Sequence, residues 1–229
     1  MSRENGAFAG AVLVSVVGLF AIGERRPRLL LEDGLVENLA AGGFLTAALL
    51  AVAALIRLRA SLTPADAVML LGTIGVATLA FLSEISFGAR LFDIRMPEMR
   101  GGGEFDGAHD IVIVMARRVS AAGRSGLIAA AVCGVVLLVA AMSLLVRFWE
   151  RFRLVLSKPF AFRLALAAGM LASAVTLDLS SSSKAKVLEE MLELAASGVL
   201  VLALLARLRE GPLPPAAPVA GIPGRTGQR

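Results

Sequence analysis

Residues 67–87 read A-V-M-L-L-G-T-I-G-V-A-T-L-A-F-L-S-E-I-S-F, an almost entirely apolar run whose last two turns contain Ser83, Glu84 and Ser86. About 20 mostly apolar residues are needed for a helix to cross the roughly 30 Å hydrocarbon core of a bilayer. The run therefore predicts a transmembrane helix. Because ionisable side chains at the end of such a helix are costly to place, Glu84 is a candidate functional residue.

The residues just before this run predict where its helix begins. Thr63 is suited to the N-cap, Pro64 to the first helical position, and Asp66 places a carboxylate near the positive end of the helix dipole. The helix is therefore expected to start at Pro64.

The rest of the chain repeats this apolar pattern. Of the 229 residues, 57% are hydrophobic, whereas a soluble domain has roughly 45–50%. The apolar runs are continuous, unlike the alternating strands of a membrane β-barrel. We expect an all-α polytopic membrane protein with about six transmembrane helices. The predicted spans are residues 6–22, 35–56, 67–87, 127–145, 160–177 and 187–206.

Two further segments complete the predicted organisation. Residues 111–122 are apolar but short and contain Arg117 and Arg118, a pattern typical of an interfacial helix lying along the lipid headgroups. Residues 1–209 are then one transmembrane domain. Residues 210–229 are rich in proline and are expected to form a disordered tail.

The charge pattern indicates a membrane partner and excludes nucleic acid. The net charge is +5, but the basic residues form short clusters between apolar runs, tyrosine is absent and aromatic residues make up 5% of the chain. The single cysteine excludes an intrachain disulfide and a cysteine-based zinc site. Six spans place both termini on one side, and basic clusters at the ends of spans two, four and six predict that this side is the cytoplasm.

With this orientation, carboxylates from the ends of several spans fall on the extracytoplasmic side, together with the only histidine. We expect them to form an acidic chamber at the depth of the membrane interface. Its expected members are Asp33, Glu37, Glu84, Glu104, Asp106, His109, Asp110, Asp178, Glu189, Glu190 and Glu193.

Within this set, His109 is the residue with the most possible roles. It could be a metal ligand, a general base or a cap of the interfacial helix. H-E-x-x-H and G-x-S-x-G motifs are absent from the sequence, and no G-K-[ST] follows the glycines at 101–103. Established zinc, serine-hydrolase and phosphate-loop patterns are therefore missing.

The segments S-E-I-S-F-G-A-R-L-F at 83–92 and G-E-F-D-G-A-H-D at 103–110 resemble a motif of uncharacterised multi-pass bacterial membrane proteins. That family carries E-x-S-W-G-Q-R followed by G-E-x-N-x-x-H-N. Here Phe87 replaces the tryptophan, Ala89 the glutamine, and Asp106 and Asp110 the two asparagines. The resemblance implies a bacterial inner-membrane protein of unassigned activity. The matching positions that it marks as site residues are Glu84, Ser86, Arg90, Glu104 and His109.

Three functional interpretations remain open. In the first, the protein is a membrane-embedded hydrolase or transferase acting on a lipid or lipid-linked substrate. Its catalytic residues would be Glu84, His109 and Glu193, and a divalent metal could bind to His109 and Glu84. The residues expected to bind the substrate are Arg90, Ser86 and Glu104.

The second interpretation is a cation- or proton-coupled transporter or an ion-binding protein, in which the carboxylates attract the cation. The third is a non-catalytic structural subunit, in which small residues such as Ala40, Gly43 and Gly198 allow close contacts between helices. Convergence of Glu84, His109 and Glu193 would argue against the structural interpretation.

Overall fold

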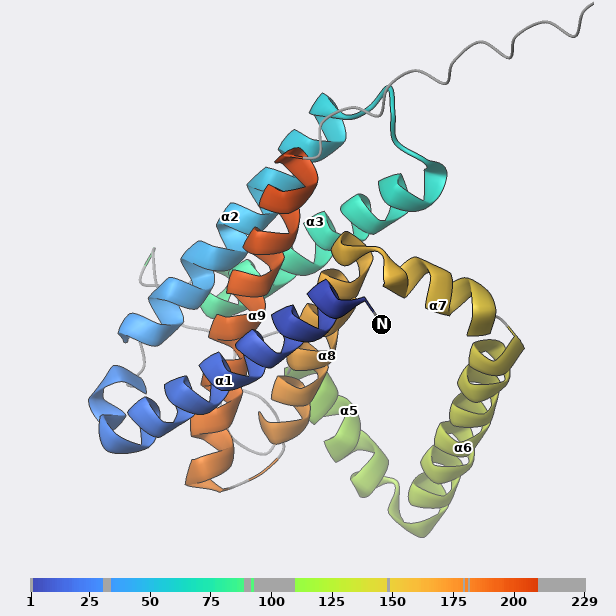
Figure 1. Ribbon diagram of the computed structural model, residues 1–229. Coiled ribbons are helices and arrows are strands. Elements are labelled where there is room, and N and C mark those ends of the chain that lie inside the picture. The colour runs from blue at the N-terminus through green and yellow to red at the C-terminus, as the bar shows by residue number, and fades with distance from the viewer. Residues whose placement is uncertain are drawn as a thin grey trace, which may run out of the picture.

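The computed structural model describes residues 2–30, 34–88, 92, 110–147, 149–178, 180 and 182–209, and throughout these residues the regular structure is helical (Figure 1). The predicted all-α fold is confirmed. In chain order the elements are α1 (Arg3–Arg25), η1 (Pro27–Leu30), α2 (Leu35–Arg57), α3 (Pro64–Glu84), η2 (Ser86–Gly88), α5 (Asp110–Ala121), α6 (Gly123–Arg147), α7 (Trp149–Ser157), α8 (Pro159–Asp178) and α9 (Ser183–Arg209).

Five of these helices, α1, α2, α3, α8 and α9, are long and apolar enough to cross a membrane. They correspond to five of the six predicted spans, with α3 ending before its predicted span does. The remaining span, 127–145, lies in α6, where the apolar stretch found among the described residues is the shorter Gly123–Leu137. Helix α5 occupies the segment predicted as interfacial, and its position along a membrane surface stays a prediction. The chain is a multi-pass membrane protein by the length and hydropathy of its helices.

Helix α9 lies at the centre of the main bundle. It packs against α2 and α8 and also contacts α1, while α3 packs against α2 (Figure 1). Alanine and glycine allow these helices to approach closely, because small side chains let backbones come together in a membrane. Gly43 of α2 faces Ser197 of α9 so closely that a β-carbon at position 43 would overlap the serine side chain. The alanines that are fully buried in the core are Ala47, Ala51, Ala54, Ala77, Ala167, Ala174, Ala196 and Ala203.

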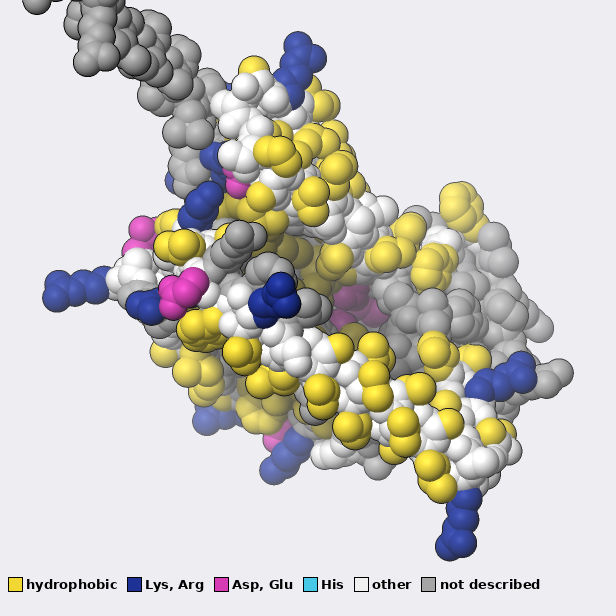
Figure 2. Space-filling model, turned by 90° about the vertical axis from the view of Figure 1, so that its right-hand side faces the viewer, with side chains coloured by type: hydrophobic (Ala, Val, Ile, Leu, Met, Phe, Trp, Pro, Cys, Tyr) yellow, Lys and Arg dark blue, Asp and Glu magenta, His cyan; other side chains and the backbone are white. Residues whose placement is uncertain are grey.

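Helices α5, α6 and α7 form an arm that stands away from this bundle (Figure 1). The main contacts of α6 are with α5 and α7, its neighbours in the chain. Large hydrophobic side chains on α6, such as Leu127, Val136 and Val146, are exposed. In the space-filling view many hydrophobic side chains also lie exposed on the face that is shown (Figure 2), as expected of helices that face lipid. Helix α7 is an addition to the elements expected from the sequence.

The start of α3 is as predicted, but its end differs. The Thr63 hydroxyl oxygen accepts a hydrogen bond from the backbone N–H of Asp66 at 3.2 Å, which confirms Thr63 as the N-cap. The helix ends at Glu84, whereas the predicted span continues to Phe87. Ser86 and Phe87 adopt φ values of 47° and 51°. The left-handed region is unfavourable for side-chain-bearing residues and cannot continue a right-handed helix, so the chain turns sharply here.

At the other end of the bundle, a buried ion pair joins α3 to α9. The guanidinium of Arg207 lies 3.7 Å from the Asp66 carboxylate, and only 8% of each residue is exposed. The Thr63 hydroxyl donates a 2.9 Å hydrogen bond to the same carboxylate. Because α3 runs away from Asp66 toward Glu84, this pair and Glu84 mark opposite ends of the same helix.

Polar contacts also join α1 to α7 and α8. The side-chain N–H of Asn5 donates to the Leu156 carbonyl at 3.2 Å, which satisfies a backbone acceptor left open at the end of α7. Arg163 of α8 lies 3.1 Å from Glu4 and stacks over the Phe8 ring at 4.5 Å. These contacts hold α1 against the bundle.

Candidate functional site

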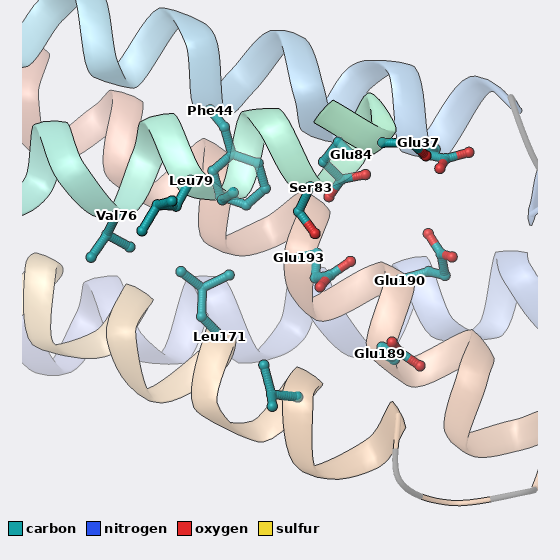
Figure 3. A pocket seen from close by; sticks show the side chains of 13 residues that line it. Glu37, Phe44, Val76, Leu79, Ser83, Glu84, Leu171, Glu189, Glu190 and Glu193 are labelled. Carbon is teal, nitrogen blue, oxygen red and sulfur yellow. The ribbon is translucent and has the colours of Figure 1, made fainter. Parts of the chain in front are cut away.

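A cavity of about 290 Å³ opens between α2, α3, α8 and α9 (Figure 3). We call it the glutamate cavity. Glutamates, serines and apolar side chains line it together. The described lining residues are Glu37, Phe44, Val76, Leu79, Ala80, Ser83, Glu84, Ser86, Leu171, Val175, Glu189, Glu190 and Glu193.

The five glutamates reach this cavity because three helix ends meet there. Glu37 is in the first turn of α2, and Glu84 is the last residue of α3. In α9, Glu189 and Glu193 are four residues apart, and residues at this spacing share one face of a helix. The antiparallel course of α3 relative to α2 and α9 therefore brings the carboxylates to one end of the bundle.

Glu193 lies in a strongly negative environment. The charged groups that act on its carboxylate are those of Glu190, Asp178 and Glu37, all of the same sign. Among the residues that the structure describes, none forms a hydrogen bond or ion pair with the Glu193 side chain. Like charges held close together repel each other, and the repulsion is stronger where water is partly excluded. A bound cation would offset this repulsion.

Ser86 contributes a hydroxyl group to the same cavity. The residue is only 4% exposed, yet its side chain forms no hydrogen bond with another described residue. Its place in the wall goes with the left-handed backbone of Ser86 and Phe87, which ends the helical course of α3. Because Ser86 lines the cavity, this hydroxyl is available to a bound molecule.

The cavity has two chemically different ends (Figure 3). The glutamate side chains and Ser83 gather at one end, and Phe44, Val76, Leu79 and Leu171 line the other. In the space-filling view, acidic side chains lie set back in a hollow flanked by apolar surface (Figure 2). Small-molecule sites commonly combine mostly apolar walls with a few polar groups in this way.

The structure places three of the six residues expected at the site, Glu84, Ser86 and Glu193, in the wall of this one cavity. The other three, His109, Arg90 and Glu104, lie outside the described residues, so their expected roles stay predictions. In the described part of the chain, no group of three or more His, Cys, Asp or Glu side chains is placed to hold a metal ion. A metal shared by His109 and Glu84 also stays a prediction.

The apolar wall residues were not among those expected at the site. A signal for some of them exists in the sequence, because Val76 and Ala80 precede Glu84 by eight and four positions. Residues four and eight positions apart lie on one helical face. Extending that face from Glu84 toward the middle of α3 would have identified part of the apolar wall.

Comparisons of the chain with protein-family models, curated proteins and solved structures find no match. Function is therefore inferred from the geometry of the glutamate cavity.

Proposed function

We propose that this multi-pass membrane protein binds a cation in the glutamate cavity, as an ion-binding protein or a cation- or proton-coupled transporter. The observation that carries the proposal is the composition of the wall. Every ionisable residue among the described lining residues is a glutamate, and the five glutamates come from three different helices. Such a wall favours positively charged ligands and disfavours anions.

Charges that serve structure in this molecule are arranged differently. Asp66 is paired with Arg207, and Glu4 is paired with Arg163. In the glutamate cavity, by contrast, the groups around Glu193 are other carboxylates. A cluster of like charges weakens a fold, and residues that weaken a fold are common where they bind a ligand. The contrast supports binding over a purely structural role.

A second candidate function is a membrane-embedded hydrolase or transferase that acts on a lipid or lipid-linked substrate. The observation in its favour is that Glu84, Ser86 and Glu193 share one cavity with apolar side chains. An amphiphilic substrate needs both kinds of wall. This candidate also requires His109 to reach the cavity.

Thermal unfolding of the purified full chain in a non-ionic detergent tests the first proposal. Na⁺, K⁺, Mg²⁺, Ca²⁺ and methylammonium are the probes. We expect at least one of them to raise Tm in a saturable manner, and Glu193→Gln to weaken its binding tenfold or more. Glu24→Gln, at an exposed position of α1, is the control and should leave binding unchanged. Absence of saturable binding, or equal binding by Glu193→Gln, would overturn the proposal.

Metal analysis distinguishes the second candidate. Wild type, His109→Ala and Glu84→Gln are purified in parallel, and their content of divalent metal and bound lipid is measured by mass spectrometry. The enzyme interpretation predicts that both substitutions reduce the metal or the lipid. Unchanged content in both variants would count against it and would leave cation binding as the better account.

A further inference from the structure

We propose that the cation bound in the glutamate cavity is a free alkylammonium: an amine whose charged end lies among the glutamates and whose aliphatic tail lies against the apolar wall. The inference rests on the proposed cation site and adds the class of ligand. It follows from the two ends of the cavity, from the spread of its carboxylates and from the Ser86 hydroxyl.

The two ends of the cavity match the two parts of such a molecule. An inorganic cation would bind to the carboxylates and make no contact with the apolar end, which is formed by Phe44, Val76, Leu79 and Leu171. The cavity volume of about 290 Å³ is also far larger than one ion requires. It lies near the lower limit of the roughly 300–1,000 Å³ that small organic ligands occupy.

The carboxylates are spread along the wall. In the described residues no three of them are placed to coordinate one metal ion, whereas Ca²⁺ requires six to eight oxygen ligands close to a single point. A protonated amine has less stringent needs. Its three N–H donors can each reach a different acceptor on the wall.

Ser86 provides an observation that is independent of the acidic cluster. Its side chain belongs to a residue that is 4% exposed, it lines the cavity, and it has no hydrogen-bond partner among the described residues. The hydroxyl oxygen can accept an N–H of the ammonium group beside Glu84 and Glu193.

Isothermal titration of the full chain in a non-ionic detergent tests the inference with hexylammonium, methylammonium, hexanoate and Ca²⁺. We expect hexylammonium to bind at least tenfold more tightly than methylammonium, because each buried methylene group can contribute up to about fourfold. Hexanoate, which has a similar tail and the opposite charge, should not bind. Micelles without protein correct for partitioning into detergent.

Two variants assign the ends of the ligand. Glu193→Gln should weaken hexylammonium and methylammonium alike. Val76→Thr combined with Val175→Thr preserves the side-chain shape at two wall positions. It should reduce the advantage of hexylammonium several-fold and leave methylammonium unchanged. Circular dichroism verifies that both variants keep the helical fold.

The outcomes separate this inference from the proposed function. If Ca²⁺ or Na⁺ binds in a Glu193-dependent manner and hexylammonium binds no better than methylammonium, the alkylammonium inference is wrong but the proposed cation site is supported. If hexanoate binds as tightly as hexylammonium, or if no probe binds, both the alkylammonium inference and the proposed cation site are wrong.

Nanodiscs of phosphatidylethanolamine and of phosphatidylglycerol test the source of the amine. Competition with hexylammonium in the first alone would assign the site to a lipid headgroup and overturn a free amine.

Discussion

The two ends of α3 and α9 carry buried charge in opposite ways. At one end Asp66 of α3 and Arg207 of α9 neutralise each other, and the Thr63 hydroxyl completes the contacts of the carboxylate. At the other end Glu84 of α3 and Glu193 of α9 share a cavity with three more glutamates. The same two helices therefore form a charge-neutral ion pair at one end and line a strongly acidic cavity at the other.

The difference shows what each end can contribute. A buried ion pair with a hydrogen bond fixes the spacing of two helices, and it is sensitive to the loss of either partner. Carboxylates that face other carboxylates, as Glu193 does, repel one another and are less suited to holding helices together. The paired end is suited to stability and the acidic end to binding. Each of the following predictions tests this division.

The largest effect is expected at the paired end. Arg207→Met leaves the Asp66 carboxylate buried without its cation, which should lower the free energy of unfolding by about 3 kcal/mol. Unfolding in mixed micelles, followed by circular dichroism, measures the loss. Arg209→Met, at an exposed position two residues later, should change little. Adding Asp66→Asn to Arg207→Met should restore part of the stability, and the absence of any recovery would argue against the ion pair.

A smaller loss is expected where α2 meets α9 between the two ends. Gly43→Ala would place a methyl group into the Ser197 side chain, and such overpacking costs about 2 kcal/mol. Gly42→Ala is a matched control, because a β-carbon at position 42 meets no atom within 4 Å. Ser197→Gly should rescue Gly43→Ala in the same unfolding assay. Equal stability of the two alanine variants would show that this contact does not set the helix spacing.

The N-cap of α3 should contribute less again. Thr63→Ala removes both the acceptor for the Asp66 N–H and the donor to its carboxylate. The expected loss is about 1 kcal/mol. Thr63→Ser keeps the hydroxyl and should stay near wild type. If serine and alanine were equally destabilising, the lost methyl group rather than the cap would be responsible.

The smallest effect should have the opposite sign. At a pH that keeps the carboxylates ionised, Glu193→Gln removes one charge from the acidic end and is expected to raise stability by about 0.5 kcal/mol without added cations, since like charges four residues apart on a helix destabilise it by about that amount. Glu24→Gln, at an exposed position, controls for the general effect of removing a carboxylate. A loss of stability in Glu193→Gln would mean that Glu193 acts as Asp66 does, in a stabilising pair.

Much of the helical fold follows from the sequence alone. The predicted span 35–56 differs from α2 by a single residue at its end, and Thr63 marks the start of α3. A continuous apolar run of about 20 residues predicts a transmembrane helix even where the local residues do not distinguish helix from strand. Helix α7 lacks such a signal, because its nine residues include two arginines among the apolar positions. A short helix of mixed character cannot be separated from a loop by periodicity.

The candidate site could be located only in part. Counting spans places Glu84 and Glu193 at the same end of a bundle, and the structure brings both into the glutamate cavity. Which helices become neighbours is a property of packing that the order of spans does not determine, so the contact of Asp66 with Arg207 had no signal in the sequence. The turn at Ser86 also had none, because neither serine nor phenylalanine favours a positive φ.

The separate position of α6 has a consequence for how the protein responds to its lipid. If α6 crosses the bilayer as the sequence predicts, its apolar residues 127–145 are about 28 Å long at 1.5 Å per residue, which is close to the roughly 30 Å of an average hydrocarbon core. Without helices of the main bundle along its sides to fix its tilt, α6 would adjust to a thinner bilayer by leaning. Thinner bilayers should therefore tilt this helix while the bundle around α9 keeps its geometry.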